Sequence, residues 1–421
     1  MKYLYMDNFR GFSETVIPLR KVNFLVGENS TGKTSVINLI SILSDISFFL
    51  SRIFDEKQSH FFGFNDIASI GSKKEAFVVG FLDASREGDH YKISFSINTF
   101  SDKNGVAELS HSIRASGDNI SAIKFEKSSI FYGSEKFINR FESSEDCLAF
   151  FKVAKAINFE DFTSLGAEKQ SLPWLFFHSL GISRKNPDSC DKGPFDLGQA
   201  LFSDIKEIAP IRSVAKRIYE ALDRSYSPEG EHIPTKIRKT ISSPGGVSFS
   251  NLINSFGSSS GLFESIKISN FGKKENSPFE ILVKISNKEI NINSVGYGVS
   301  QVLPIAVEFL TGKNSTFVVQ QPEVHLHPKA QAALGDLIHD VSLTKNNLFV
   351  IETHSNYLID RFRVAVRKGE SEPDSQVLFF ARDNVRNSVS CIEINKNGSY
   401  SCQPDGFLDF FMNEEMSILG I

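Results

Sequence analysis

Cysteine and tryptophan are scarce in this chain. Its 421 residues include one tryptophan and four widely separated cysteines, Cys147, Cys190, Cys391 and Cys402. The cysteines form no CxxC pair, which argues against a disulfide framework and against a cysteine-rich zinc site. We therefore expect a reducing, cytoplasmic environment.

The chain also lacks a strong excess of charge and a long hydrophobic run. Its 46 Lys and Arg residues nearly balance 50 Asp and Glu residues, for a formal net charge of -4, so no overall positive field would hold a nucleic acid. The most apolar stretch, residues 36–54, is interrupted by polar side chains and predicts a buried helix rather than a membrane span. The first residues lack the pattern of a signal peptide. We expect no membrane segment, and any nucleic-acid contact would be a local patch.

Apolar side chains are abundant, with 41% hydrophobic residues and 39 phenylalanines, enough to fill more than one core. Strands alternating with helices at both ends of the chain predict an α/β fold with a mixed or parallel sheet. We expect residues 1–134 to form the first half of this α/β domain, including an antiparallel β meander over residues 76–132. Residues 135–262 are expected to form a mainly helical insertion, and residues 263–421 the second half of the domain.

Short apolar runs and helical periodicity predict the elements that carry the motifs. Strands are expected at residues 2–6, 15–19, 22–26, 266–271, 279–285, 289–293, 317–319, 348–351 and 377–380. Helices are expected at residues 36–53, at residues 300–310 and from about Lys329.

A glycine-rich loop follows the third predicted strand. Residues 27–34 read Gly-Glu-Asn-Ser-Thr-Gly-Lys-Thr, which matches GxxxxGK[ST] between an apolar strand and a periodic helix. In such a loop the backbone N–H groups surround phosphates, Lys33 neutralises charge and the Thr34 hydroxyl binds Mg²⁺. The sequence therefore predicts that ATP and Mg²⁺ are bound by Gly27, Asn29, Ser30, Thr31, Gly32, Lys33, Thr34 and Ser35.

Two later strands end in polar residues. Residues 317–328 read FVVQQPEVHLHP, and residues 348–355 read LFVIETHS. Because the carboxyl ends of strands in an α/β sheet hold ligands, these two strand ends could together surround one triphosphate. His325 and His327 are weaker candidates for a metal site, since no cysteine or third histidine stands near them.

These three segments resemble the Walker A, Walker B with D-loop, and switch-histidine segments of ABC-class ATPases. The branch in question is the soluble, OLD-like, AAA-labelled group that includes ATPase subunits of bacterial anti-phage systems. Asn8-Phe9-Arg10-Gly11-Phe12 resembles the opening of RecF-like and SMC-like heads, and residues 294–305 (SVGYGVSQVLPI) resemble the ABC signature motif. The resemblance implies that Arg10 lies beside the nucleotide and that His354 contacts the γ-phosphate. It makes Gln320, Gln321 and His354 the candidates for catalysis. It also implies that a second subunit's γ-phosphate meets Gly296, Gly298 and Ser300.

One position departs from the family pattern. The family usually has an acidic residue where Gln320 stands, and a neutral amide cannot act as a base. Thr34 and Gln320 are still the positions expected to face the metal, and Gln321 would orient water as an amide does in some GTPases. Glu323 is the nearest carboxylate and an alternative base. Either the chain hydrolyses ATP weakly or not at all, or Gln320 is an introduced substitution made to trap ATP, and the sequence leaves both open.

Two functions from different classes follow. In the first, a homodimer or larger homo-oligomer closes around ATP and controls a separate effector, a nuclease or toxin, in anti-phage defence. In the second, the chain is a DNA-end-binding repair factor or a nuclease of the RecF or OLD kind. Only 421 minus 355, or 66, residues follow Ser355, and they contain no DxD pair where a nuclease domain is expected. A nuclease in the same chain is therefore disfavoured, while DNA or RNA binding stays open.

Overall fold

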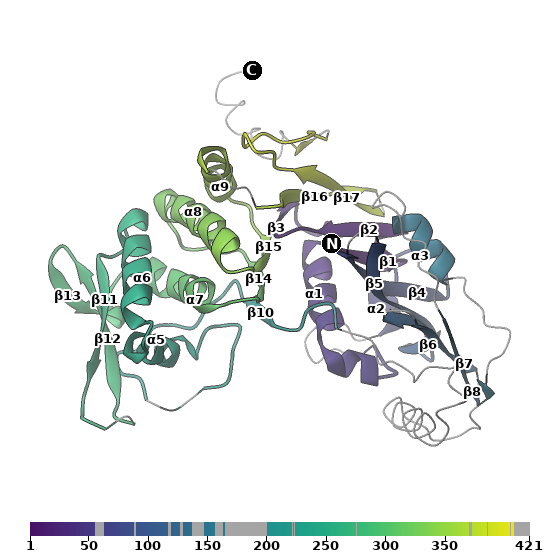
Figure 1. The fold of residues 1–421 in the computed structure, drawn as a ribbon, viewed down its shortest axis with the longest axis horizontal. Coiled ribbons are helices and arrows are strands. Elements are labelled where there is room, and N and C mark those ends of the chain that lie inside the picture. Colours follow the sequence, from purple (N-terminus) through teal and green to yellow (C-terminus); the bar gives the residue numbers. More distant parts are fainter. Residues whose placement is uncertain are drawn as a thin grey trace. The chain divides into compact units, whose positions relative to one another are not determined.

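The structure is a computed structural model, shown in Figure 1. It describes residues 1–407 except 55–62, 88–89, 117–118, 127–128, 137–146, 156–162, 165–199, 221, 223, 275, 370–372, 385 and 405. The chain divides into two compact units. The first comprises Met1–Leu19, Glu28–Ser203 and Phe380–Cys391, and the second comprises Arg20–Gly27, Asp204–Phe379 and Ile392–Ile421.

The first unit is built on an antiparallel sheet of eight strands, in the order β2-β1-β4-β5-β6-β7-β8-β9. The strands are β1 Lys2–Asp7, β2 Thr15–Leu19, β4 Ala76–Glu87, β5 His90–Lys103, β6 Val106–Ser116, β7 Asn119–Glu126, β8 Ser129–Lys136 and β9 Thr163–Ser164. Its helices are α1 Lys33–Ser44, the 3₁₀ turn η1 Ile46–Leu50, α2 Phe64–Ile67 and α3 Cys147–Lys155. The predicted meander is confirmed.

Phenylalanine fills the first unit's core. The rings of Phe54, Phe77 and Phe100 lie with their centroids 5.1 to 5.3 Å apart, in the range of favourable aromatic contacts. On another part of the sheet, Phe151 of α3 stacks on Tyr5 of β1 at 4.6 Å. Both clusters are almost fully buried, so these phenylalanines belong to the core of the first unit.

The second unit contains the parallel strands β10 Ile205–Ile208, β14 Thr316–Gln320, β15 Leu348–Glu352 and β3 Val22–Gly27, which pair in that order. β16 Ser375–Asp383 and β17 Arg386–Glu393 complete a six-stranded sheet. A separate antiparallel sheet consists of β11 Ser265–Asn270, β12 Phe279–Ile285 and β13 Lys288–Asn291. The predicted α/β class, with parallel strands and an antiparallel β subdomain, is confirmed.

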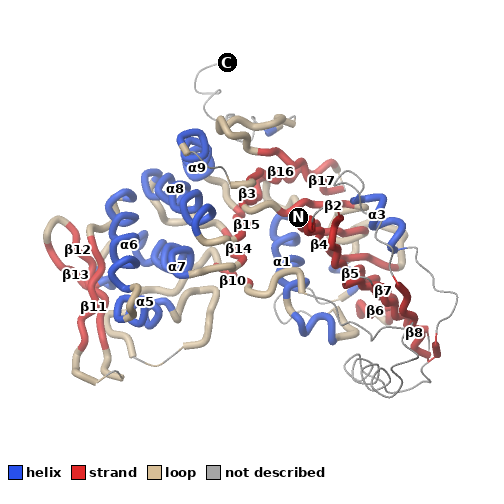
Figure 2. The backbone as a smooth tube through the Cα atoms, viewed as in Figure 1, coloured by secondary structure: helices blue, strands red, loops and turns tan. Residues whose placement is uncertain are grey.

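Helices pack on both sheets of the second unit. They are α5 Ile233–Ser242, α6 Gly246–Ser260, α7 Tyr297–Thr311, α8 Pro328–Thr344 and α9 Asn356–Lys368, with the 3₁₀ turn η4 Ile292–Ser294. Figure 2 shows α6 alongside the three-stranded sheet, which it contacts at β11. On the parallel sheet, Phe309 of α7 packs on Phe317 and Phe349, and Phe362 of α9 packs on Phe24. None of the described helices has the length and apolarity to cross a membrane.

Two predicted elements are wrong in detail. The helix expected over residues 36–53 ends at Ser44, because Asp45 is extended and its side chain accepts a hydrogen bond from the Ser47 N–H. Within the region expected to be mainly helical, β10 is a strand of the parallel sheet, since it pairs with β14. Most of residues 137–199 lie outside the described residues, so the predicted boundaries near 134 and 262 stay a prediction.

Candidate functional site

The glycine-rich loop between β3 and α1 has an unusual backbone. β3 ends at Gly27, with φ of 145°, and α1 begins directly after Gly32, with φ of 98°. Ser30 also has a left-handed φ, 65°. The Lys33 ammonium donates a hydrogen bond of 2.7 Å to the Glu28 carbonyl, and Lys33 is only 4% exposed. The positive charge is thus held at the loop, next to backbone of the type that binds anions.

An aromatic ring explains the second glycine of this loop. A Cβ atom on Gly32 would lie 2.5 Å from Phe12 Cζ and 3.0 Å from Asn387 Nδ2. Phe12 belongs to the turn that opens the chain, where Phe9 and Phe12 exchange backbone hydrogen bonds of 3.1 and 2.8 Å. Any side chain at Gly32 would displace this turn from the loop.

The same turn places Arg10 beside α1. Arg10 Nε lies 3.5 Å from Ser35 Oγ, and Arg10 Nη1 donates to the Asp66 carbonyl at 2.7 Å. Asn387 fixes the turn from the other side, because its amide donates to the Arg10 carbonyl at 2.8 Å and its backbone N–H to the Gly11 carbonyl at 2.9 Å. Nothing in the local sequence marks Asn387 as a partner of this turn, because Asn387 comes 377 residues after Arg10.

The other loop residues suit bound ATP with Mg²⁺. Thr31 is buried and its hydroxyl donates to the Glu28 carbonyl at 2.8 Å, so it braces the loop rather than facing solvent. Asn29 and Thr34 are exposed. An exposed hydroxyl at the first turn of α1 is the donor type that Mg²⁺ takes in such loops, and Lys33 supplies the charge for the phosphates. The residues present therefore fit the group.

In the second unit, Gln320 and Gln321 stand at the carboxyl end of β14, where β14 lies beside β15. Gln321 has a left-handed φ of 45°, and its N–H donates to the Glu352 carbonyl at 2.8 Å. Both glutamines are half-buried. The turn that follows β14 is thereby fixed against the neighbouring strand.

A buried arginine donates hydrogen bonds to the carboxyl end of β14. Arg212, only 2% exposed, donates to the carbonyl oxygens of Gln301, Gln320 and Gln321 at 3.3, 3.4 and 3.2 Å. The Gln301 side chain binds the Arg212 backbone in return. Its Nε2 donates to the Arg212 carbonyl and its Oε1 accepts from the Arg212 N–H, both at 3.4 Å. Burial lowers the pKa of Arg212 to about 10, although the Glu323 carboxylate opposes the shift. Arg212 therefore stays charged at neutral pH and ties α7 to the end of β14.

Glu323 joins the turn after β14 to the turn after β15. One carboxylate oxygen accepts from the Thr353 hydroxyl at 2.8 Å and the other from the His354 N–H at 2.7 Å. Ser355, which caps α9, donates to the Gln331 side chain at 2.6 Å. The structure thus brings the segments of Gln320, Gln321 and His354 together within the second unit. Glu323, the alternative base, has one oxygen bonded to the Thr353 hydroxyl and the other to the His354 N–H.

The segment resembling a signature motif forms the start of α7, three residues earlier than predicted. Gly296 is exposed, with ordinary φ of -55°, and a Cβ there would meet no atom within 4 Å. Gly298 is different, because its Cβ would lie 3.0 Å from the His325 carbonyl. The Tyr297 ring contacts the His325 ring at 4.8 Å, so the start of α7 packs against the turn after β14. Ser300 is buried and donates to the Tyr297 carbonyl at 2.8 Å.

The two neighbouring histidines have structural surroundings. His325 makes the contact with Tyr297, and His327 Nδ1 accepts from the Lys329 N–H at 3.3 Å to cap α8. Within the described part of the chain, no three His, Cys, Asp or Glu side chains gather as ligands for a metal ion.

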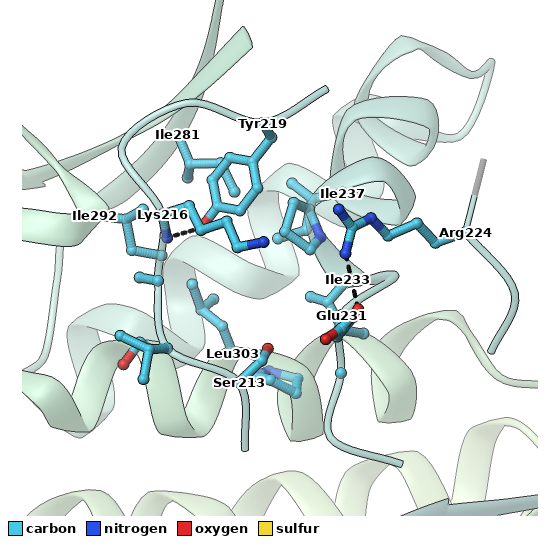
Figure 3. A pocket seen from close by; sticks show the side chains of 16 residues that line it. Ser213, Lys216, Tyr219, Arg224, Glu231, Ile233, Ile237, Ile281, Ile292 and Leu303 are labelled. Carbon is cyan, nitrogen blue, oxygen red and sulfur yellow. Dashed lines mark hydrogen bonds and ion pairs between the residues drawn. The ribbon is translucent and has the colours of Figure 1, made fainter. Parts of the chain in front are cut away.

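A small pocket lies near the first turns of α7 (Figure 3). Leu303 and Ser300 line it from α7, and Lys216 and the ion pair of Arg224 with Glu231 lie around it. Its volume is about 60 Å³. Small-molecule sites usually occupy roughly 300 Å³ or more, so this pocket is too small for a nucleotide.

Comparison with known proteins reveals one family and several solved structures. A family model described as "AAA domain, putative AbiEii toxin, Type IV TA system" matches residues 22–360. No curated protein matches the chain. An SMC head bound to the C-terminal winged-helix domain of ScpA is similar at 12% identity, over 94% of this chain and 98% of that chain, with a TM-score of 0.47. The SMC head domain from Thermotoga maritima is similar at 13% identity, over 93% and 98%, with a TM-score of 0.43.

Proposed function

The chain belongs to the family of AAA domains described as putative AbiEii toxins of type IV toxin–antitoxin systems, and from this premise we propose that it is an ATP-driven molecular switch. This membership confirms the predicted AAA-labelled ATPase family. ATP hydrolysis is the general activity of such ATPases, with Mg²⁺ as the usual cofactor. In the proposed switch, two copies close around two ATP molecules, each bound by the Walker residues of one copy and the signature segment of the other.

One observation carries the nucleotide-binding part of this proposal. The loop of GxxxxGKT sequence holds Lys33 inside its own backbone and opens directly into the amino end of α1. That arrangement presents N–H groups and an ammonium to an anion. The residues proposed to act on ATP are those the sequence indicates: Arg10, Gly27, Asn29, Ser30, Thr31, Gly32, Lys33, Thr34, Ser35, Gln320, Gln321 and His354 of one copy, with Gly296, Gly298 and Ser300 of the other.

Pairing of two copies is supported by the surface at the start of α7. Gly296 is exposed with open space around it, and Tyr297 is 42% exposed beside His325. The amino end of a helix attracts anions, so a partner's γ-phosphate suits this position. ATP would then stabilise the pair, because each phosphate gains donors that a single copy lacks.

Control of a separate effector in anti-phage defence is the remaining part of the proposal. It rests on the resemblance to ATPase subunits of such systems, and the effector would be a nuclease or toxin. Slow hydrolysis is also proposed, since a neutral amide at Gln320 cannot take the proton of an attacking water. A long-lived ATP-bound pair would follow.

The test mixes two variants of the full chain. Lys33→Ala should abolish ATP binding, because the loop loses its charge. Gly296→Glu should fold, since its side chain enters open space and an acidic residue suits a helix start, but it should repel a partner's phosphate. Gly296→Gln, of equal size and neutral, is the control matched for size and should pair more readily than Gly296→Glu, because it lacks the negative charge.

Pairing is measured by light scattering with and without ATP and Mg²⁺. Neither Lys33→Ala nor Gly296→Glu alone should pair, whereas their mixture should recover pairs containing one complete site. Unchanged ATP affinity in Lys33→Ala would remove the nucleotide site from the proposal. A mixture that stays monomeric while the native chain pairs would show that the sites are not shared between copies.

A further inference from the structure

We propose that Glu352 supplies the carboxylate that holds Mg²⁺ at this site, in place of the acidic residue missing at Gln320. The inference rests on the proposed function, because it assigns a ligand for the metal of the bound ATP. Glu352 is the last residue of β15 and is 6% exposed. It stands directly before Thr353 and His354, yet nothing in its local sequence marks it as a ligand.

Strand register places Glu352 beside Gln320. In the parallel pair of β14 and β15, the Cα partner of Glu352 is Gln320, so their side chains leave the same face of the sheet, about 4.8 Å apart. On the other side, Glu352 pairs with Leu25 of β3, two residues before Gly27, where β3 ends. Glu352 is therefore between the Walker B strand and the strand that leads into the glycine-rich loop.

The backbone around Glu352 is fixed on both sides. Its carbonyl accepts the Gln321 N–H at 2.8 Å, and the next residue, Thr353, donates to the Leu25 carbonyl at 3.1 Å. Gln321 is itself held by Arg212. A ligand whose Cα cannot shift loses little conformational freedom when it binds an ion, so the position is suited to a metal.

The chemistry of the neighbouring residues points the same way. Mg²⁺ in nucleotide sites takes one or two carboxylates together with phosphate oxygens and water. Gln320 offers only a neutral amide oxygen. Glu323 lies three residues beyond the end of β14, in the turn, where it contacts Thr353 and His354. Among the described residues that end β14 and β15, Glu352 is the carboxylate in register with the position that the family makes acidic.

The experiment measures how much Mg²⁺ tightens nucleotide binding. The dissociation constant of a fluorescent, non-hydrolysable ATP analogue is determined for the full chain with Mg²⁺ and with EDTA, and the ratio of the two is the metal-dependent gain. Glu352→Gln should reduce this gain at least about tenfold, as expected for loss of a metal ligand. A double variant with Glu352→Gln and Gln320→Glu moves the carboxylate from β15 to the neighbouring strand β14 and should restore the metal-dependent gain in affinity.

Controls separate the possible failures. Glu289→Gln removes an exposed carboxylate from β13 and should leave the gain unchanged. Glu352→Asp keeps the charge but places the carboxylate one methylene closer to the backbone, so the metal-dependent gain should fall in part. This variant keeps the inference testable if Glu352→Gln does not fold. If both Glu352 variants keep the metal-dependent gain of the native chain, the inference is overturned and the proposed function stays intact. Equal binding by the native chain and Lys33→Ala would overturn both.

Discussion

Glu323 accepts a hydrogen bond from the backbone N–H of His354 at 2.7 Å, and this contact joins two loops that belong to different strands. The other oxygen of Glu323 accepts from the Thr353 hydroxyl at 2.8 Å. A carboxylate used in this way stabilises a turn and sets the position of a histidine. The turn after β14 is therefore hydrogen-bonded directly to the backbone of His354.

Replacing Glu323 distinguishes a positioning role from a general base. Glu323→Gln keeps an oxygen for the His354 N–H and an amide for the Thr353 hydroxyl, so turnover should stay near the native level. Glu323→Ala leaves both groups unpaired and should lower the free energy of unfolding by about 1 to 3 kcal/mol. Urea unfolding and ATP turnover are measured for both. If Glu323→Gln stops turnover as completely as Glu323→Ala does, the carboxylate acts as a base.

Arg212 should be important for stability because it satisfies several backbone carbonyls in the interior. Arg212→Met fills a similar volume but leaves those oxygens without donors, so we expect a loss of about 3 kcal/mol in urea unfolding. Arg212→Lys should lose less, since an ammonium retains the charge but lacks the planar fork. The control is Arg361→Met, which breaks an exposed ion pair with Asp336 and should cost less than about 1 kcal/mol. Equal losses at both positions would contradict the bridging role.

Acid should weaken the buried ion-pair cluster in which Glu308 of α7 contacts His232 and Lys236. Burial by itself raises the pKa of Glu308, but contacts with His232 at 2.9 Å and Lys236 at 2.7 Å outweigh it and leave the pKa below its ordinary value of 4.5. Because the folded pKa is the lower one, the stabilisation is present above pH 4.5 and is lost as the pH falls through the folded pKa.

The matching variant is Glu308→Gln, compared with the native chain by urea unfolding at several pH values. Near neutral pH it should lower the free energy of unfolding by about 2 to 3 kcal/mol, and the difference should shrink below pH 4.5. Glu289→Gln, which alters an exposed pair with Lys267, serves as the control and should show neither effect. A difference that stays constant down to acid pH would show that Glu308 is not ionised in the folded chain.

Sequence analysis predicted the elements whose signals are local. The apolar strand, glycine-rich loop and helix around Lys33 follow one another within a few residues, so their order needs no tertiary information. β12 was predicted with the observed bounds because its buried residues, such as Ile281 and Val283, alternate with more exposed ones. Such an alternating pattern can be recognised within one strand, because it depends only on which face of that strand is buried.

Features that depend on distant partners were not predictable. β10 is short, and it becomes a strand because it pairs with residues 316–319 of β14. The pairing of Glu352 with Gln320 depends on the strand order of the sheet, which no single segment encodes. The burial of Arg212 follows from its contacts with α7 and β14, which its local sequence does not encode.

The last prediction concerns the chemistry of Gln320. If Glu352 holds the metal, a carboxylate restored at position 320 should act mainly on the attacking water, where a general base typically contributes about 10² to 10⁴-fold in rate. Gln320→Glu should therefore raise single-turnover hydrolysis at saturating ATP, while the affinity for ATP changes by less than about tenfold. Gln321→Glu is the neighbouring comparison and should raise the rate only if that side chain faces the water. Rapid hydrolysis by the native chain, unaffected by Gln320→Glu, would mean that another residue is the base and that the end of β14 is not the catalytic centre.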